Sequence, residues 1–332
     1  MTNNTTATVP ATASAVSQAQ SLVRRHWTTL TPIAALVVMV IGFSFMSPQF
    51  LTIENAVNIL FDSSVLLVLA LASTLIILMG SIDLSVGSTL ALSAFAGALL
   101  ARSTDNYWVL LLMPVVGLVC GLLNGLGVAF LRLPSFLVTL GSYFVYNGLA
   151  NYFSNGQPVT LRKFAPLTWF SGKIGGFPVI AIWAIAALIV VALLVRYTRG
   201  GRYLYAIGGN EKTATLVGAP VRRVKVWAFA AAGLLAGLAA LMQVAKLQSA
   251  SPDMGEAYML PAIAAVVMGG TPLTGGLGGP LRSLIGVLVI AILSNGMVLG
   301  AVNPHLQDVV QGLVVVAAVA VTIDRRRKEV VK

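Results

Sequence analysis

Long apolar runs recur along nearly the whole of this chain of 332 residues, and they limit its fold more than any other feature. A run of about 17–25 apolar residues crosses the ~30 Å hydrocarbon core of a membrane as one helix. The runs are continuous rather than alternating, which disfavours membrane-spanning strands. Only 9% of the residues are charged, whereas soluble domains carry about a quarter. The sequence therefore predicts an all-α polytopic membrane protein.

Ten spans are predicted, some of them short or broken, and the eighth is the shortest. We place them at residues 27–46, 60–79, 85–101, 107–130, 134–153, 179–197, 224–245, 257–269, 281–299 and 306–323. With a cytoplasmic N-terminus, the outer loops hold only five of the 21 basic residues, namely Arg102, Arg162, Lys163, Lys173 and Lys246. The reverse orientation would invert this bias, so the positive-inside rule predicts that both termini are cytoplasmic.

The expected parts of the chain follow from these spans. Residues 1–26 form a flexible cytoplasmic tail, residues 27–323 a transmembrane domain in the lipid bilayer of the cell inner membrane, and residues 324–332 a basic cytoplasmic tail. The net charge of +11 does not predict nucleic-acid binding, because the basic residues lie in loops where the positive-inside rule accounts for them. Outer acids such as Asp253 and Glu256 are expected to be solvated loop charges, and Thr52 to Phe61 is expected to be an external amphipathic segment.

Motifs for covalent, phosphate or metal chemistry are missing from the sequence. Cys120 is the single cysteine, so the chain forms no internal disulfide, and His26 and His305 lie too far apart to indicate a metal site. The G-x-x-x-x-G-K-[ST] phosphate loop and the G-x-S-x-G and H-E-x-x-H motifs do not occur. We therefore expect no metal, no bound cofactor and no enzymatic reaction. If this chain carries out driven transport, the energy comes from a partner or from an ion gradient.

The largest basic loop, at about 198–223, contains the signal for a short ordered helix. Gly208, Gly209 and Asn210 precede the run Glu211 to Leu216, which is followed by Gly218 and Pro220. Asn210 is a good N-cap, and the later glycine and proline stop a helix. A loop that served only to orient the protein in the membrane would need the positive charges but not a capped helix. The loop is therefore predicted to dock a partner on the cytoplasmic face.

Two breaks interrupt the apolar pattern, at residues 79–88 and 268–276, and they resemble each other at an offset of 189. Asn124-Gly125 and Asn295-Gly296 resemble each other at an offset of 171, so a single duplication does not explain both pairs and an internal repeat stays open. Non-helical backbone at membrane depth survives only against protein or beside a water-filled cavity. The candidate residues of a polar pathway are Asp83, Ser85, Gly87, Ser88, Asn124, Thr271, Thr274 and Asn295.

Each of these residues also has a purely structural interpretation. A carboxylate such as that of Asp83 is energetically costly near a membrane span and usually has a function there. It also suits a helix cap formed together with Ser85 at the membrane edge. Asn124 and Asn295 lie inside apolar runs, where asparagine commonly bonds a neighbouring helix. The sequence leaves both interpretations open.

Three segments, in order along 27–323, resemble motifs of one known family. Residues 80–88 resemble G-G-I-D-L-S-V-G-S, with Ser81 replacing a glycine. Residues 199–218 are similar to R-x-G-R-x-x-Y-A-I-G-G-N-E-x-A-A-x-x-x-G, with Thr213 and Ala214 at the paired alanines. Residues 262–276 resemble A-I-A-A-V-V-I-G-G-T-x-L-x-G-G, with Pro272 at a position where the family usually has a small residue.

The family that these motifs resemble is the membrane permeases of ribose-type ATP-binding cassette sugar importers. This resemblance implies a fold of about ten helices and alternating access for a monosaccharide. It implies three partners: an ATPase subunit that uses the ATP, a periplasmic sugar-binding protein, and a second permease subunit that is either a copy or a paralogue. The part implied to couple to the ATPase is made of Gly208, Gly209, Asn210, Glu211, Thr213, Ala214 and Gly218. The alternative is a proton- or sodium-coupled secondary transporter, which would depend on the intramembrane acids Asp83 and Asp308.

Overall fold

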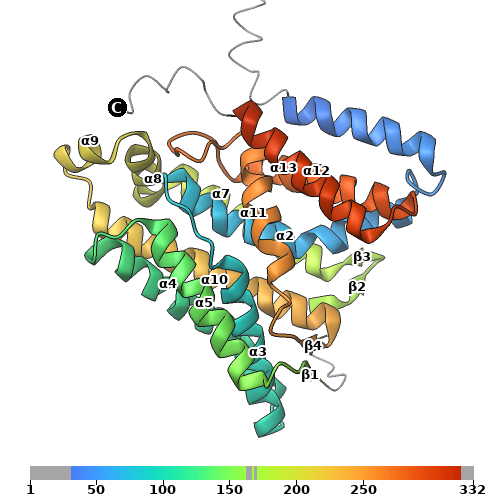
Figure 1. Cartoon of the computed structure of the whole chain (residues 1–332), viewed down its shortest axis with the longest axis horizontal. Coiled ribbons are helices and arrows are strands. Elements are labelled where there is room, and N and C mark those ends of the chain that lie inside the picture. The colour runs from blue at the N-terminus through green and yellow to red at the C-terminus, as the bar shows by residue number, and fades with distance from the viewer. Residues whose placement is uncertain (1–30, 162–166, 168–169, 323–332) are drawn as a thin grey trace, which may run out of the picture.

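The computed structural model describes residues 31–161, 167 and 170–322 as a helical bundle (Figure 1). The tails predicted over 1–26 and 324–332 lie outside the described residues. The helices are Thr31–Met46, α2 (Ile53–Leu78), α3 (Val86–Thr104), η1 (Tyr107–Leu112), α4 (Met113–Phe130), α5 (Ser135–Ser154), α7 (Val179–Tyr197), α8 (Arg199–Gly209), α9 (Glu211–Leu216), α10 (Val221–Leu247), α11 (Glu256–Met268), α12 (Pro280–Leu299) and α13 (Pro304–Thr322).

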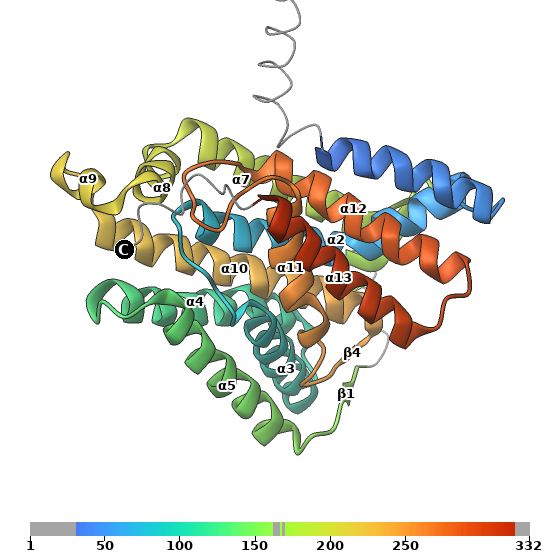
Figure 2. The same cartoon turned by 45° about the horizontal axis from the view of Figure 1, so that its top comes forward.

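Two long helices, α2 and α10, form the centre of the bundle. Every residue of α2 from Ser63 to Leu78 is buried, so this part of the helix contacts protein on all sides. Helix α10 packs against α4, α2 and α3, and Figure 2 shows it running between α4 and α2. A helix that is apolar all round is expected at such a central position.

Glycines bring α4 and α10 into backbone contact. A Cβ atom at Gly121 would overlap the Phe229 carbonyl oxygen, and one at Gly233 would overlap the Gly117 carbonyl oxygen. Membrane helices associate through close van der Waals packing rather than through a hydrophobic driving force, and small residues permit the approach. The α4–α10 crossing is therefore fixed by the absence of side chains at these positions.

Short strand pairs lie in the connections between helices. β1 (Val159–Thr160) pairs antiparallel with β4 (Ser249–Ala250), with Val159 opposite Ala250. β2 (Lys173–Ile174) pairs antiparallel with β3 (Phe177–Pro178). The first pair joins the segment after α5 to the segment after α10, so it links two connections that are distant in sequence.

Within the described residues, each of the ten predicted spans overlaps a helix, the fourth covering both η1 and α4, although one boundary was wrong. Helix α2 begins at Ile53 rather than at residue 60, and the Thr52 hydroxyl caps it by accepting the Asn55 N–H at 3.2 Å. The predicted external amphipathic segment is thus the first part of a membrane helix. Among the described residues, six helices are long and apolar enough to cross a membrane. The protein is a polytopic helical membrane protein.

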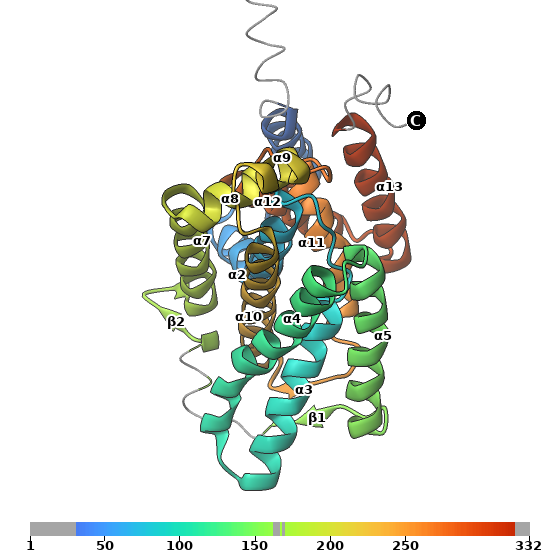
Figure 3. The same ribbon diagram turned by 90° about the vertical axis from the view of Figure 1, so that its left-hand side faces the viewer.

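The basic loop holds two helices where the sequence predicted one. Helix α8 begins after Thr198, whose hydroxyl accepts the Gly201 N–H at 3.1 Å. Helix α9 begins after Asn210, whose side-chain oxygen accepts the Thr213 N–H at 2.9 Å. The predicted Asn210 cap is therefore confirmed. Figure 3 shows α8 and α9 together at one end of the bundle.

Candidate functional site

The first break places Asp83 in a buried polar network. The Asp83 carboxylate accepts the Ser85 N–H at 2.8 Å and the Ser85 hydroxyl at 2.6 Å, and the Asn124 amide donates to that hydroxyl at 2.8 Å. The Tyr146 hydroxyl lies 3.2 Å from the Asn124 side-chain oxygen and extends the network to α5. All four side chains are buried, Asp83 at 7% exposure. Buried polar groups of this kind are stable only when each one is hydrogen-bonded.

Asp83 does not cap α3 in the usual manner. A capping side chain accepts an N–H from inside the first turn, whereas Asp83 bonds Ser85, the residue that precedes the helix. It closes a turn around residue 84 and is enclosed by protein instead of lying at an exposed edge. The cap interpretation is therefore wrong in detail, because the carboxylate organises the turn that leads into the helix.

Side chains of α5 bond the extended backbone of the first break. The Ile82 N–H donates to the Ser135 hydroxyl at 3.1 Å, and the Leu84 N–H donates to the Thr139 hydroxyl at 3.1 Å. These bonds replace the helical bonds that the break lacks, as backbone inside a membrane protein requires. Within this chain, the break is packed against protein.

Gly87 and Ser88 follow the break on the first turn of α3. A Cβ atom at Gly87 would overlap the Gly255 carbonyl oxygen, so this glycine allows α3 to touch the segment that leads into α11. The Ser88 hydroxyl donates to the Ser85 carbonyl oxygen at 3.0 Å. Both residues take part in packing in this chain.

The second break separates its two threonines. Thr271 is fully buried, and its hydroxyl accepts the Gly279 N–H at 3.2 Å, which closes the loop at its base. Thr274 lies at the exposed tip. Ser283 on α12 shares a hydrogen bond with Thr74 on α2 at 2.7 Å, so the loop returns to the central helix directly after the break.

Asn295 belongs to a different part of the molecule from Asn124. Its side chain forms a reciprocal amide pair with Asn55, with N–O distances of 2.8 and 2.9 Å. This pair joins α12 to the first turns of α2. The likeness between Asn124 and Asn295 in the sequence therefore does not reflect equivalent sites.

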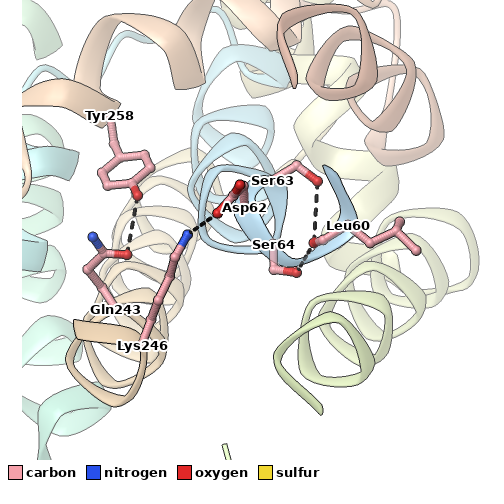
Figure 4. A network of polar contacts seen from close by, with 7 residues as sticks. All are labelled: Leu60, Asp62, Ser63, Ser64, Gln243, Lys246 and Tyr258. Atoms are coloured by element: carbon pink, nitrogen blue, oxygen red, sulfur yellow. Dashed lines mark hydrogen bonds and ion pairs between the residues drawn. The ribbon is translucent and has the colours of Figure 1, made fainter. Parts of the chain in front are cut away.

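A pocket beside Asn295 was missed by the sequence analysis. It has a volume of about 250 Å³. Its polar lining residues are Asp62, Ser63, Tyr258, Ser294, Asn295 and Gln311. Figure 4 shows Lys246 reaching Asp62 at 2.6 Å and the Tyr258 hydroxyl reaching Gln243 at 3.2 Å. The sequence held a signal for this pocket, because Asp62 and Lys246 lie near the ends of predicted spans. They are 184 positions apart, so their pairing was not predictable from the sequence.

Both breaks meet the end of α8 at one point, which we call the glycine junction (Gly80, Gly208, Gly275 and Gly276). The Gly276 N–H donates to the Leu78 carbonyl oxygen at 2.9 Å. A Cβ atom at Gly208 would overlap that oxygen and the Gly276 nitrogen, and one at Gly80 would lie 2.9 Å from the Thr274 carbonyl oxygen. Three segments distant in sequence thus touch through backbone alone.

The short helix α9 projects from the glycine junction with an exposed apolar end. Leu216 is 86% exposed and Val217 is 77% exposed, whereas Ala214 is buried. The Lys225 ammonium lies 2.7 Å from the Glu211 carboxylate and ties the helix to α10. Gly218 has a φ of +83°, which ends the helix, and Gly209 has no atom near its missing Cβ. Exposed apolar side chains among basic residues are typical of a protein-binding surface.

The described residues contain no group of three potential metal ligands. The arrangement holds buried hydrogen-bond networks, the short exposed helix α9 and backbone contacts between them. Such an arrangement is suited to transmitting movement between packed elements.

Comparisons with known proteins agree on one family. The family model described as "Branched-chain amino acid transport system / permease component" matches residues 55–319. The ribose import permease protein RbsC of Bacillus subtilis (strain 168) is 39% identical over 301 residues, covering 90% of this chain and 93% of the relative. RbsC of Escherichia coli (strain K12) is 39% identical over 293 residues, covering 86% and 91%. The D-allose transport system permease protein AlsC of the same strain is 33% identical over 288 residues, covering 86% and 88%.

No solved structure matches this chain. The matched relatives are transport subunits rather than enzymes, and they align over most of their own length. The chain belongs to the family of membrane permease subunits of ribose-type ATP-binding cassette importers.

Proposed function

We propose that this chain forms the path by which an importer carries a monosaccharide across the inner membrane by alternating access. The observation that carries the proposal is the glycine junction, which connects α8 and α9 to both breaks through backbone contacts. The substrate class follows from the relatives, whose names specify ribose and D-allose. A permease of this kind supplies differential binding between two conformations and no covalent chemistry.

In the proposed topology, the ten predicted spans cross the membrane, the short helices α8 and α9 do not, and both termini are cytoplasmic. This topology places both breaks and the α8–α9 segment on the cytoplasmic face. Their direct contact at the glycine junction supports that arrangement, since elements on opposite faces cannot touch. The transmembrane domain then covers 27–323, flanked by cytoplasmic tails over 1–26 and 324–332.

The partner at the cytoplasmic face is proposed to be an ATPase subunit, which uses the ATP, so that this chain binds no cofactor itself. Helix α9 would insert Leu216 and Val217 into a groove of that subunit, while Asn210 and Glu211 hold the helix in place. Gly208, Gly209, Thr213, Ala214 and Gly218 complete the coupling loop. A periplasmic sugar-binding protein and a second permease subunit, identical or paralogous, are the remaining proposed partners.

The residues at the two breaks are proposed to form the inner gate of the path. Asp83, Ser85, Ser88 and Asn124 hold the first break in shape, and Thr271 closes the second. Gly87 permits the approach to Gly255, Thr274 is exposed at the tip, and Asn295 stabilises the outer part of α12. Secondary transport driven through Asp83 gains no support from the family, and the carboxylate is enclosed by bonds from Ser85.

Reconstitution tests this function directly. The permease, its co-purifying ATPase and the sugar-binding protein are placed in liposomes, and uptake of radiolabelled D-ribose and D-allose is measured with and without ATP. We expect uptake of a monosaccharide only when ATP is present on the ATPase side. Uptake that needs a proton or sodium gradient instead of ATP would overturn the proposal.

The coupling role of α9 has a separate test in the same liposomes. Leu216→Ser removes the exposed apolar end, and we expect about tenfold less ATPase to co-purify. Asn210→Ala weakens the cap by about 1 kcal/mol and is expected to lower uptake per ATP hydrolysed. Thr215→Ala, on the same short helix, is the matched control. Unchanged coupling in both Leu216→Ser and Asn210→Ala would remove α9 from the mechanism.

A further inference from the structure

Helix α5 is too polar for a helix surrounded by lipid. It has 20 residues, enough to cross a membrane, but it is not among the six helices that are apolar enough to do so. Asn147 and Asn151 lie on a helix that has one face buried against α3 and α4. Polar side chains within membrane helices normally face protein or a water-filled cavity.

A row of hydrogen bonds links these side chains to α11. Positions 143, 147 and 151 recur every four residues and share one stripe of α5. The Asn151 amide donates to the Asn147 side-chain oxygen at 2.8 Å, and the Asn147 amide donates to Glu256 Oε1 at 3.1 Å. The Tyr143 hydroxyl donates to the same carboxylate oxygen at 3.2 Å. We call these four residues the α5 ladder.

Glu256 was expected to be a solvated loop charge; it is exposed, but it belongs to a helix and not to a loop. It is the first residue of α11 and is held by two side chains that lie 109 and 113 positions away. Both donors use Oε1, and no described residue bonds Oε2. The carboxylate is exposed in this chain, so one of its oxygens is open to accept a hydroxyl group.

The ladder lies on one side of the molecule, beside further exposed helix surface. Figure 3 shows α5 and α13 on the same side of the molecule, with α11 nearer the centre. Asn147 and Tyr143 are half-buried, whereas Val145 is 56% exposed and points away from the ladder stripe. Glu256 lies directly before the predicted span of 257–269, and an exposed carboxylate beside a membrane span is stable where it meets water or polar protein.

We propose that the α5 ladder is a contact site for monosaccharide hydroxyl groups on the translocation path, facing the second permease subunit. This inference rests on the proposed function and adds to it the residues that contact the sugar. Carboxylates and side-chain amides supply the acceptors and donors that match sugar hydroxyls, and a tyrosine adds an aromatic surface. The ladder is distinct from the buried network around Asp83, whose polar groups bond one another.

Labelling of engineered cysteines tests whether the ladder faces water and sugar. In a Cys120→Ser background, Asn147→Cys and Val145→Cys are compared in the complete transporter in liposomes, using a negatively charged methanethiosulfonate. We expect Asn147→Cys to react at least about tenfold faster than Val145→Cys, and the transported sugar to slow its reaction about fivefold. Tyr143→Cys replaces Asn147→Cys if the latter does not assemble. An unreactive ladder position, or one that the sugar does not protect, would overturn the proposal.

Transport stoichiometry tests the role of Glu256. Glu256→Gln keeps the shape and an acceptor but removes the charge, and we expect sugar moved per ATP hydrolysed to fall about tenfold while ATP hydrolysis stays within about twofold. Asp253→Asn, an exposed acid three positions earlier, is the control and is expected to leave both rates unchanged. A merely structural role would lower uptake and hydrolysis in proportion, and that result would contradict the proposal. Unaltered uptake per ATP would also contradict it. If the wild-type transporter moves no monosaccharide, the proposed function fails before the ladder is in question.

Discussion

The two breaks begin with the same helix ending. Gly80 after α2 has a φ of +72°, and Gly270 after α11 has a φ of +88°. The Ser81 N–H bonds the Ile76 carbonyl at 3.2 Å, and the Thr271 N–H bonds the Val266 carbonyl at 3.2 Å. Both are helix ends closed by a left-handed glycine, where glycine carries no Cβ penalty. The structural offset is therefore 190, one more than the 189 found in the sequence.

The breaks differ in what holds them after that shared start. The first is bonded to α5 through Ser135 and Thr139, and its polar side chains Ser81, Asp83 and Ser85 are buried. The second is longer and exposed at its tip, and it is bonded to α8, since the Tyr205 hydroxyl donates to the Gly278 carbonyl at 2.9 Å. The comparison shows that the same left-handed glycine ending leads into two breaks that are held by different helices. These contacts predict that the second break receives movement from α8 and that the first passes it to α5 across the glycine junction.

The largest expected effect on uptake comes from a substitution that separates the two breaks at the glycine junction. Gly208→Ala would drive a Cβ into the Leu78 carbonyl oxygen and the Gly276 nitrogen. Alanine favours an isolated helix by about 1 kcal/mol, but overpacking against backbone costs about 1–3 kcal/mol. We expect uptake to fall at least about tenfold with much of the ATP hydrolysis retained.

Gly209→Ala is a close control for that change. It lies on the same helix, and no atom is within 4 Å of its missing Cβ. Uptake by this variant is expected to stay within about twofold of the wild-type rate. Equal loss in both variants would mean that glycine flexibility, and not the contact between the breaks, is what α8 requires.

The second largest effect concerns the buried network of the first break. Asp83→Ala leaves the Ser85 N–H and hydroxyl without their acceptor, and a buried unsatisfied group costs about 1–3 kcal/mol. We expect a lower unfolding temperature in detergent and little assembled transporter. Asp83→Asn retains an acceptor oxygen, so its unfolding temperature is expected to fall by about half as much as that of Asp83→Ala. Proton-driven flux that disappears in Asp83→Asn would instead favour secondary transport.

A smaller effect is expected at the bond between α8 and the second break. Tyr205→Phe removes only the hydroxyl that reaches Gly278, at a cost of about 1 kcal/mol. If the second break receives the movement, uptake per ATP hydrolysed falls by about threefold to fivefold while the unfolding temperature changes little. Thr139→Val, which cuts the bond between α5 and the first break, is expected to lower the unfolding temperature more. If Thr139→Val lowered uptake per ATP and Tyr205→Phe lowered the unfolding temperature, the first break and not the second would be the one that receives the movement.

Local patterns in the sequence predicted much of this architecture. Ten apolar runs predicted ten helices, and Asn210 predicted the start of α9, because span length and capping depend on neighbouring residues. Contacts between distant segments were not predictable. Asp62 made the start of α2 resemble an external segment, but Lys246 pairs with it. The glycines in α8 resembled a loop, yet Thr198 caps that helix and Gly208 packs against the breaks.

The smallest expected effect lies at the tip of the second break. Thr274 is exposed, and none of its side-chain atoms makes a hydrogen bond within the described residues. Thr274→Ala should change the free energy of unfolding by less than about 0.5 kcal/mol, as for surface substitutions in general. Its backbone oxygen still faces Gly80, so the glycine junction stays intact. Uptake should therefore also be unchanged if the tip acts only through its backbone. Slower uptake at wild-type stability would mean that this hydroxyl contacts the sugar at the inner end of the path, and the second break would then line the path as well as transmit movement to it.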